Sequence, residues 1–136
     1  MKKIDNNIKY VMDASAIIAV ANQEPHIPEL PQMFLSSIIT TINLAEALIV
    51  IIKKLNLNID NIWDELRNFV PNHYPINDEL TYAIVKMAPY TNQFGLSLGD
   101  KCCLGLAQKL KLPVYTGDRI WKKLETQLNI EVNLIR

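Results

Sequence analysis

The sequence predicts an α/β fold with a central, mostly parallel five-stranded sheet that is covered by helices on both faces. Five short apolar segments suited to strands alternate with longer segments whose apolar residues recur at helical spacing. Strand–helix–strand units of this kind form right-handed crossovers, which place helices on the two faces of a parallel sheet. The 136 residues, 49% of them hydrophobic, suffice for one packed core, so we expect a single domain over residues 1–136.

The N-terminal third predicts two strands joined by a helix and a proline-punctuated connection. Residues 9–12 are expected to form the first strand, and residues 13–22 a helix with its apolar side chains on one face. Three prolines interrupt the following stretch, which leaves room for a short helix over residues 29–34. Residues 36–39 are expected to form the second strand.

Two helices and a third strand follow. Thr40 or Thr41 can cap a long helix that continues to about Leu55. This helix is apolar almost all round, so we expect it to be buried on more than one side. A second, amphipathic helix is expected over residues 59–69, before a strand at residues 73–75.

The C-terminal half continues the alternation. Residues 78–90 predict a helix whose end Pro89 disturbs, because proline lacks the N–H group that a helix interior needs. Ser97 is expected to open another helix that ends near Leu110. The remaining expected elements are a fourth strand, a last helix and a fifth strand, at residues 113–116, 118–128 and 130–135.

Charge and cysteine content limit the classes of function. Lysine and arginine number 14 and are balanced by 14 acidic residues, so any polyanionic partner has to meet a local basic patch. Cys102 and Cys103 are adjacent, which is not the spacing of a disulfide framework or of a zinc site. They predict two free thiols packed on a helix, in a protein of a reducing compartment.

The sequence predicts neither a secretory leader nor a membrane-spanning segment. The opening segment MKKIDNNIKY lacks the apolar stretch of a secretory leader. The most apolar run, residues 47–52, is far shorter than the ~20 residues that a membrane span requires. We therefore expect a soluble protein of the cytoplasm, with no membrane partner.

Four acidic residues fall where a parallel sheet positions ligands, at strand ends or in the first turns of the following helices. They are Asp13, Glu46, Asp100 and Asp118. Ligands bind at the carboxyl ends of such strands, so four loops carrying these acids can converge at one edge of the sheet. Glu46 also interrupts an apolar run, where a charge without a partner is costly.

Each acid also has a purely structural interpretation. Asp13 and Asp118 can be helix N-caps, and residues 97–100 can form a capping box. If the acids share one pocket instead, their repulsion has to be balanced by a cation. Carboxylates without histidine or cysteine suit Mg²⁺ or Mn²⁺, and the chemistry that these ions support best is metal-assisted phosphodiester hydrolysis.

Three segments of the chain resemble one protein family. They are YVMDASAIIA (residues 10–19), TINLAEAL (residues 41–48) and GLSLGDKCCLGLAQKLKLPVYTGDRIW (residues 95–121). In this order and at this spacing they resemble a PIN-domain protein, and more narrowly a VapC-type toxin of a toxin–antitoxin pair. The resemblance spans nearly the whole chain, although residues 56–92 match only in their helical pattern.

This resemblance implies a PIN-like three-layer α/β/α fold and a metal-dependent endoribonuclease that hydrolyses RNA phosphodiester bonds with Mg²⁺ (or Mn²⁺). The catalytic and metal-binding acids of such proteins fall on Asp13, Glu46, Asp100 and Asp118. The resemblance also implies toxin homodimers and a cognate VapB-type antitoxin whose C-terminal segment occupies the active groove.

Four more residues are candidates because they lie beside the acids. Ser15 and Thr116 match small hydroxyl residues that support the acids or a metal-bound water in similar proteins, and ordinary local hydrogen bonding is the alternative. Lys101 and Arg119 each follow an acid directly and are candidate contacts to RNA phosphates. The alternative for these two cations is a solvated helix surface.

Other prominent side chains have structural interpretations. His26 and His73 are expected at the surface or a sheet edge, and Trp121 is expected to pack the last helix onto the sheet. The strongly apolar helix around residues 44–52 is first of all core, and secondarily a surface for an antitoxin helix or a second copy.

Three other functions compete with the endoribonuclease. A signal-receiver domain would need paired acids after the first strand and a lysine at the end of the fifth, and a dehalogenase-type phosphatase would need Asp-x-Asp where this chain has Asp13-Ala14-Ser15. The third is a catalytically weak PIN-fold binding module that acts through antitoxin or operator association. The sequence leaves this alternative open.

Overall fold

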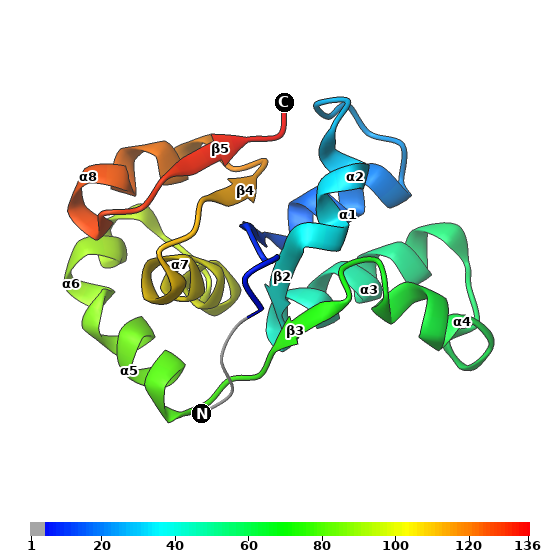
Figure 1. The fold of residues 1–136 in the computed structure, drawn as a ribbon, viewed down its shortest axis with the longest axis horizontal. Coiled ribbons are helices and arrows are strands. Elements are labelled where there is room, and N and C mark those ends of the chain that lie inside the picture. The colour runs from blue at the N-terminus through cyan, green and yellow to red at the C-terminus, as the bar shows by residue number, and fades with distance from the viewer. Residues whose placement is uncertain (1–4) are drawn as a thin grey trace.

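Five parallel strands form one sheet in the order β3-β2-β1-β4-β5, in a computed structural model that describes residues 5–136 (Figure 1). The strands are β1 (Tyr10–Met12), β2 (Ser37–Thr40), β3 (Asn72–Tyr74), β4 (Val114–Thr116) and β5 (Val132–Leu134). In the central strand, Val11 pairs with Ile38 on one side and with Val114 on the other. All five predicted strands are therefore present, and the sheet is parallel throughout its described strands. Residues 1–4, the start of the segment judged not to be a leader, lie outside the described part.

Alternation along the central strands gives the fold its three layers. Successive side chains of a strand point to opposite faces of a sheet. Val11 and Ile38 accordingly belong to the core on one face, and Met12 and Ile39 to the core on the other. Because both faces are covered, these strands are apolar at successive positions, as expected for a parallel sheet.

The helices divide between the two faces as the crossovers require. One face is covered by α1 (Ala14–Ala21), α2 (Leu30–Met33), α3 (Thr41–Leu55) and α4 (Ile59–Arg67). The other is covered by α5 (Asp78–Lys86), α7 (Leu98–Leu110) and α8 (Glu125–Leu128), with α6 (Ala88–Thr91) beside them. Short 3₁₀ segments are η1 (Phe34–Ser36), η2 (Asn92–Phe94) and η3 (Arg119–Leu124). Figure 1 shows the two groups of helices on opposite sides of the sheet, which confirms the predicted PIN-like α/β/α arrangement.

Two helices near the C-terminal half differ from their predicted extents. The helix expected over residues 78–90 ends at Lys86, and Pro89 lies near the start of the separate α6. The helix expected over residues 118–128 begins as the 3₁₀ segment η3 and becomes α-helical only in α8. A 3₁₀ turn aligns residues three apart, and here it directs Trp121 and Leu124 into the core together, both fully buried.

The prediction that the apolar helix α3 is buried on more than one side was wrong. Its buried residues lie on a single face, at positions 43, 44, 47, 48 and 51. On the opposite face Ile49 is 68% exposed and Ile42 is 39% exposed. The described residues thus leave an apolar stripe of α3 uncovered.

The expectations for the two cysteines, for Trp121 and for the two histidines are confirmed. Cys102 and Cys103 are buried free thiols on α7, and Trp121 is fully buried. His26 and His73 are partly exposed, and a ring nitrogen of each bonds a backbone carbonyl oxygen nearby. No helix within residues 5–136 is long and apolar enough to cross a membrane.

Candidate active site

The carboxylate of Asp13 lies at the carboxyl end of the central strand β1 and is only 8% exposed. Its Oδ1 accepts a hydrogen bond from the backbone N–H of Ala14 at 2.8 Å, so Asp13 is the N-cap of α1, as its structural interpretation required. Its Oδ2 accepts hydrogen bonds from the hydroxyl groups of Ser15 and Thr116, each at 2.8 Å. The Thr116 bond comes from the neighbouring strand β4, and a helix cap alone does not need it.

The hydroxyl groups of Ser15 and Thr116 also hold the turn after β4. Ser15 Oγ accepts the backbone N–H of Gly117 at 2.9 Å, and Thr116 Oγ1 accepts that of Asp118 at 3.0 Å. The side chain of Asp118 accepts the N–H of Ile120 at 3.0 Å and caps η3. Asp118 is therefore tied to Asp13 through Thr116, while its carboxylate is turned to its own helix start.

A buried asparagine, Asn43, links Glu46 to the first turn of α7. Asn43 is fully buried, and its Nδ2 donates to Glu46 Oε1 and to the carbonyl oxygen of Gly99, each at 2.9 Å. Thr40 Oγ1 donates to Asn43 Oδ1. A β-carbon at position 99 would stand 2.3 Å from Glu46 Oε1, so only glycine leaves space for this carboxylate.

Asn43 and Gly99 were not predicted from the sequence. The available signal was spacing: Asn43 lies three residues after the cap Thr40 and three before Glu46, which places all three side chains along one helix face. Contact with Gly99, which is 56 residues away, has no local signal.

Asp100 completes a group of three acids. It forms the predicted capping box: the Ser97 N–H donates to Asp100 Oδ2 at 2.9 Å, and Ser97 Oγ accepts the Asp100 N–H. The adjacent Cys103 is fully buried, and burial, followed by the charges of Asp13, Asp100 and Glu46, raises the pKa of its thiol well above the usual value. These three acids thus gather around Cys103, at the carboxyl edge of the sheet.

Burial keeps Asp13 partly protonated near neutral pH. Desolvation raises the pKa of its carboxyl group to about 6, the hydrogen bonds from Ser15 and Thr116 oppose the rise, and the charge of Asp100 adds to it. None of the three ion pairs found among residues 5–136 includes Asp13, Glu46, Asp100 or Asp118. The repulsion among these carboxylates is not balanced by a cationic side chain. A divalent ion such as Mg²⁺, which prefers oxygen ligands, would balance it.

The charges of Asp13, Glu46 and Asp100 all act on the Cys103 thiol, and Asp118 is linked to Asp13 through the hydroxyl group of Thr116. As the side chains lie, no group of three or more histidine, cysteine or acidic residues in the described chain is arranged to hold a metal ion. Joint coordination by all four acids stays a prediction. It would require rotation of the exposed Glu46 and of Asp118 away from the η3 cap.

Three cationic residues lie near the acids in the chain or in the fold: Lys101 in the first turn of α7, Arg119 at the start of η3, and Arg136 at the C-terminus. Lys101 is partly exposed and Arg119 is exposed, each next to its acid in the chain, and the structure gives neither a contact that tests a role with phosphate. Arg136 was not predicted. Its Nη2 would lie 3.3 Å from a β-carbon at Gly117, and its Nη1 donates to the carbonyl oxygen of Pro25 at 3.3 Å and lies 3.6 Å from Glu24.

Solved structures share the fold of this protein over almost the whole chain. A chain of VapBC2 from Rickettsia felis, bound to a promoter DNA fragment, superposes with a TM-score of 0.68 over 93% of this chain and 98% of that one, at 16% identity. The chain has a PIN-like fold. DNA-bound VapBC from Salmonella typhimurium gives 0.66 over 93% and 98% at 17% identity, and FitAcB from Neisseria gonorrhoeae gives 0.64 over 90% and 95% at 14%. No family model and no curated protein sequence matches the chain.

We predict that the buried carboxyl group of Asp13 makes the metal-free protein less stable as pH rises. Its folded pKa of about 6 exceeds the unfolded value of 3.8, so the native state holds the proton more tightly between these values. The contribution of this carboxyl group to the free energy of unfolding is therefore lost as pH rises through 6. Between pH 4 and pH 7 the loss is about 2 kcal/mol.

Urea unfolding in EDTA at several pH values, for the wild type and Asp13→Asn, measures this loss. The asparagine variant cannot titrate at position 13. Between pH 4 and pH 7 its free energy of unfolding should therefore fall by about 2 kcal/mol less than that of the wild type. Asp60→Asn, at an exposed helix start, is the matched control and should follow the wild type. Parallel curves for the wild type and Asp13→Asn would contradict the assignment.

Proposed function

We propose that this protein is a metal-dependent endoribonuclease that hydrolyses RNA phosphodiester bonds, and that it is the toxin of a VapBC-type toxin–antitoxin pair. The observation that carries the proposal is the buried carboxylate of Asp13, with its raised pKa, beside Glu46 and Asp100 at the carboxyl edge of the sheet. A structural cap is normally solvated, whereas this one is buried among other acids. The shared fold with VapBC chains supports the same conclusion.

The residues that would hold Mg²⁺ or Mn²⁺ are Asp13, Glu46, Asp100 and Asp118. Such an ion supplies an activated water and stabilises charge on the phosphate. Ser15 and Thr116 fix the direction of Asp13, since their two hydroxyl groups occupy one of its oxygens and leave less freedom to the other. Asn43 does the same for Glu46.

The RNA backbone would be met by the cations of the same loops, because four acids alone repel phosphate. Lys101 and Arg119 are the candidates from the sequence, and Arg136 joins them because its guanidinium lies beside Gly117. The ion pair between Arg136 and Glu24 is partly exposed, so salt and water weaken it, and a phosphate can compete for the guanidinium.

The partner implied for such a toxin is a VapB-type antitoxin. A groove of about 620 Å³ between α3 and α4 is lined largely by apolar side chains, including Leu48, Ile49, Ile52 and Trp63. It fits the apolar face of an antitoxin helix. Replacing Ile49 by Glu should then prevent co-purification of a co-expressed antitoxin. A toxin homodimer and a cytoplasmic location are part of the same proposal.

Cleavage of a labelled RNA panel tests the enzymatic part. The wild type should cut at least one RNA with Mg²⁺ or Mn²⁺ and lose the activity in EDTA. Asp13→Asn keeps the size of the side chain and removes its charge, so it should lower the rate at least 100-fold, and Glu46→Gln and Asp100→Asn should act similarly. Asp60→Asn should cut like the wild type.

No metal-dependent cleavage of any RNA would contradict the enzyme. The result would favour the catalytically weak binding module instead. The VapBC complexes from Rickettsia felis and Salmonella typhimurium were solved bound to DNA.

Gly99 and Gly105, both on α7, provide a paired test of how Glu46 is placed. A methyl group at position 99 displaces the Glu46 carboxylate, which is the end of a flexible side chain, so stability should change little. Activity and Mn²⁺ affinity should fall at least tenfold. Gly105→Ala faces Leu80 at 3.3 Å and no acid, so it should keep metal affinity even if thermal stability changes. Calorimetric Mn²⁺ titration and thermal melts separate the two effects, and equal Mn²⁺ affinity in both variants would contradict the role of Gly99.

A further inference from the structure

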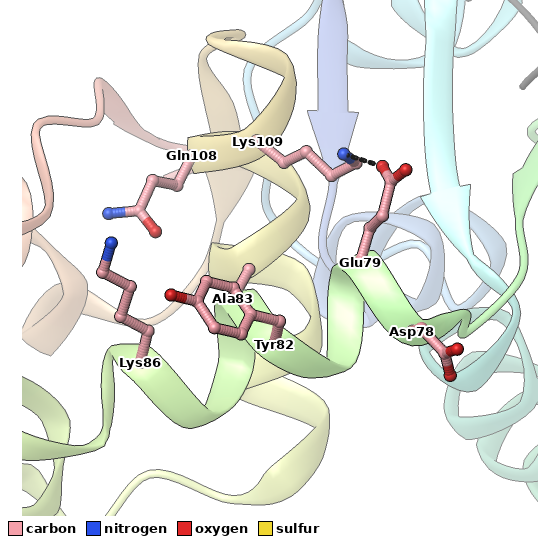
Figure 2. Close-up of a pocket in the computed structure, with 7 residues that line it drawn as sticks. All are labelled: Asp78, Glu79, Tyr82, Ala83, Lys86, Gln108 and Lys109. Atoms are coloured by element: carbon pink, nitrogen blue, oxygen red, sulfur yellow. Dashed lines mark hydrogen bonds and ion pairs between the residues drawn. The ribbon is translucent and has the colours of Figure 1, made fainter.

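The outward face of α5 is apolar at its centre, where Tyr82 is 67% exposed and Val85 is 66% exposed. A hollow of about 580 Å³ lies beside it, between α5 and α7 (Figure 2). Within this hollow Lys109 forms an ion pair with Glu79. The ammonium group of Lys86 lies 5.7 Å from the centre of the Tyr82 ring, within range of a cation–π contact. Both cations of the hollow therefore have partners, and an RNA phosphate gains little there.

The position of Arg136, in contrast, is set by the strand that precedes it. Ile135 is fully buried, its N–H donates to the Thr116 carbonyl oxygen at 3.0 Å, and its carbonyl oxygen accepts the N–H of Ile27 at 2.7 Å. Thr116 is also the residue whose hydroxyl group bonds Asp13. The backbone therefore brings the side chain of Arg136 to the strand end that holds the buried acid.

The guanidinium group of Arg136 keeps donors for an anion. Arginine has several N–H donors, and in the described part of the chain one hydrogen bond is found for them, from Nη1 to the carbonyl oxygen of Pro25 at 3.3 Å. Nη2 faces Gly117, where a β-carbon would stand 3.3 Å from it and 3.6 Å from Ser15 Oγ. That hydroxyl group donates to Asp13 Oδ2 at 2.8 Å. An anion beside Gly117 is thus within reach of the guanidinium group and next to the acid site.

The carboxylate of Glu24 occupies the outer side of the same guanidinium group. Its Oε1 lies 3.6 Å from Arg136 Nη1, and the two side chains are 34% and 41% exposed. An ion pair with this exposure contributes little to stability and is screened by salt. Its two partners can therefore separate at little cost.

The backbone of Glu24 is nevertheless fixed, because α1 ends in a Schellman turn. The Glu24 N–H donates to the carbonyl oxygen of Ala19 at 2.8 Å, and the Gln23 N–H donates to that of Val20 at 3.3 Å. Gln23 has a φ of 57°, the left-handed conformation that such a turn requires at this position. A fixed backbone directs Glu24 to Arg136, while the weak ion pair leaves its side chain free to be displaced.

We propose that Glu24 is an internal competitor for RNA: its carboxylate occupies the Arg136 guanidinium group in the free protein, and a phosphodiester of bound RNA takes its place. Phosphate oxygens match the arginine fork at least as well as a carboxylate does, so the exchange conserves the charge-assisted contact. The inference rests on the proposed function for RNA as the ligand. Binding is measured in EDTA, so an RNA that binds but is never cut with metal would contradict the nuclease and leave this inference standing.

Fluorescence anisotropy of a labelled oligouridylate of about 12 nucleotides tests the competition. At low salt Glu24→Gln should bind this RNA about threefold more tightly than the wild type, because the competing charge is gone. Arg136→Gln should bind it roughly fivefold more weakly. In the double variant the Glu24→Gln change should have little effect, since it acts through Arg136.

Glu29→Gln is the matched control, because it removes a carboxylate from the same segment. Glu29 is exposed and takes part in none of the ion pairs found among residues 5–136. Its replacement should change RNA affinity less than Glu24→Gln does. A gain of equal size in Glu29→Gln, or in Glu24→Gln when Arg136 is already replaced, would overturn the competition in favour of general electrostatics. Unchanged affinity in Glu24→Gln, or no RNA binding by any variant, would overturn it as well.

Discussion

The hydrogen bond from Thr116 to Asp13 joins the two central strands at the point where chemistry is expected. Three hydrogen bonds reach the Asp13 carboxylate, and each bond to a charged acceptor contributes roughly 1.5–3 kcal/mol. Its pKa is nevertheless raised to about 6, so the cost of burying the charge exceeds what these bonds return. The site holds Asp13 in position without satisfying its charge. That imbalance is what separates it from an ordinary helix cap, and a cation would correct it.

Asn43 performs the corresponding task between the helices on opposite faces of the sheet. It links Glu46 on α3 to the Gly99 carbonyl at the start of α7, and it is itself held by Thr40 at the end of β2. A buried amide with these partners has little freedom, since leaving any of them unpaired costs about 1–3 kcal/mol. Gly99 and Asn43 therefore act together: the glycine leaves space for the Glu46 carboxylate at the edge of the sheet, and the asparagine holds it there.

Much of the fold could be predicted from the sequence, because strands and helix caps depend on residues that are close together in the chain. Alternating apolar segments located all five strands, and Asp13, Ser97 and Asp118 are the helix caps that their residue types suggested. What failed depends on contacts that no local pattern encodes. The all-round apolar character of α3 predicted burial on several sides, yet nothing within residues 5–136 covers Ile49. Arg136 reaches the Gly117 turn only because β5 lies beside β4.

The two uncovered apolar surfaces belong to different layers, and this separates their uses. The α3–α4 groove lies on the layer that also carries Glu46. The α5 face lies on the opposite layer and is flanked by charges of both signs, which an apolar helix would leave unpaired. Polar groups left without partners at an interface cost more than neutral contacts return. An apolar helix is therefore better matched by the α3–α4 groove than by the charged surface of α5.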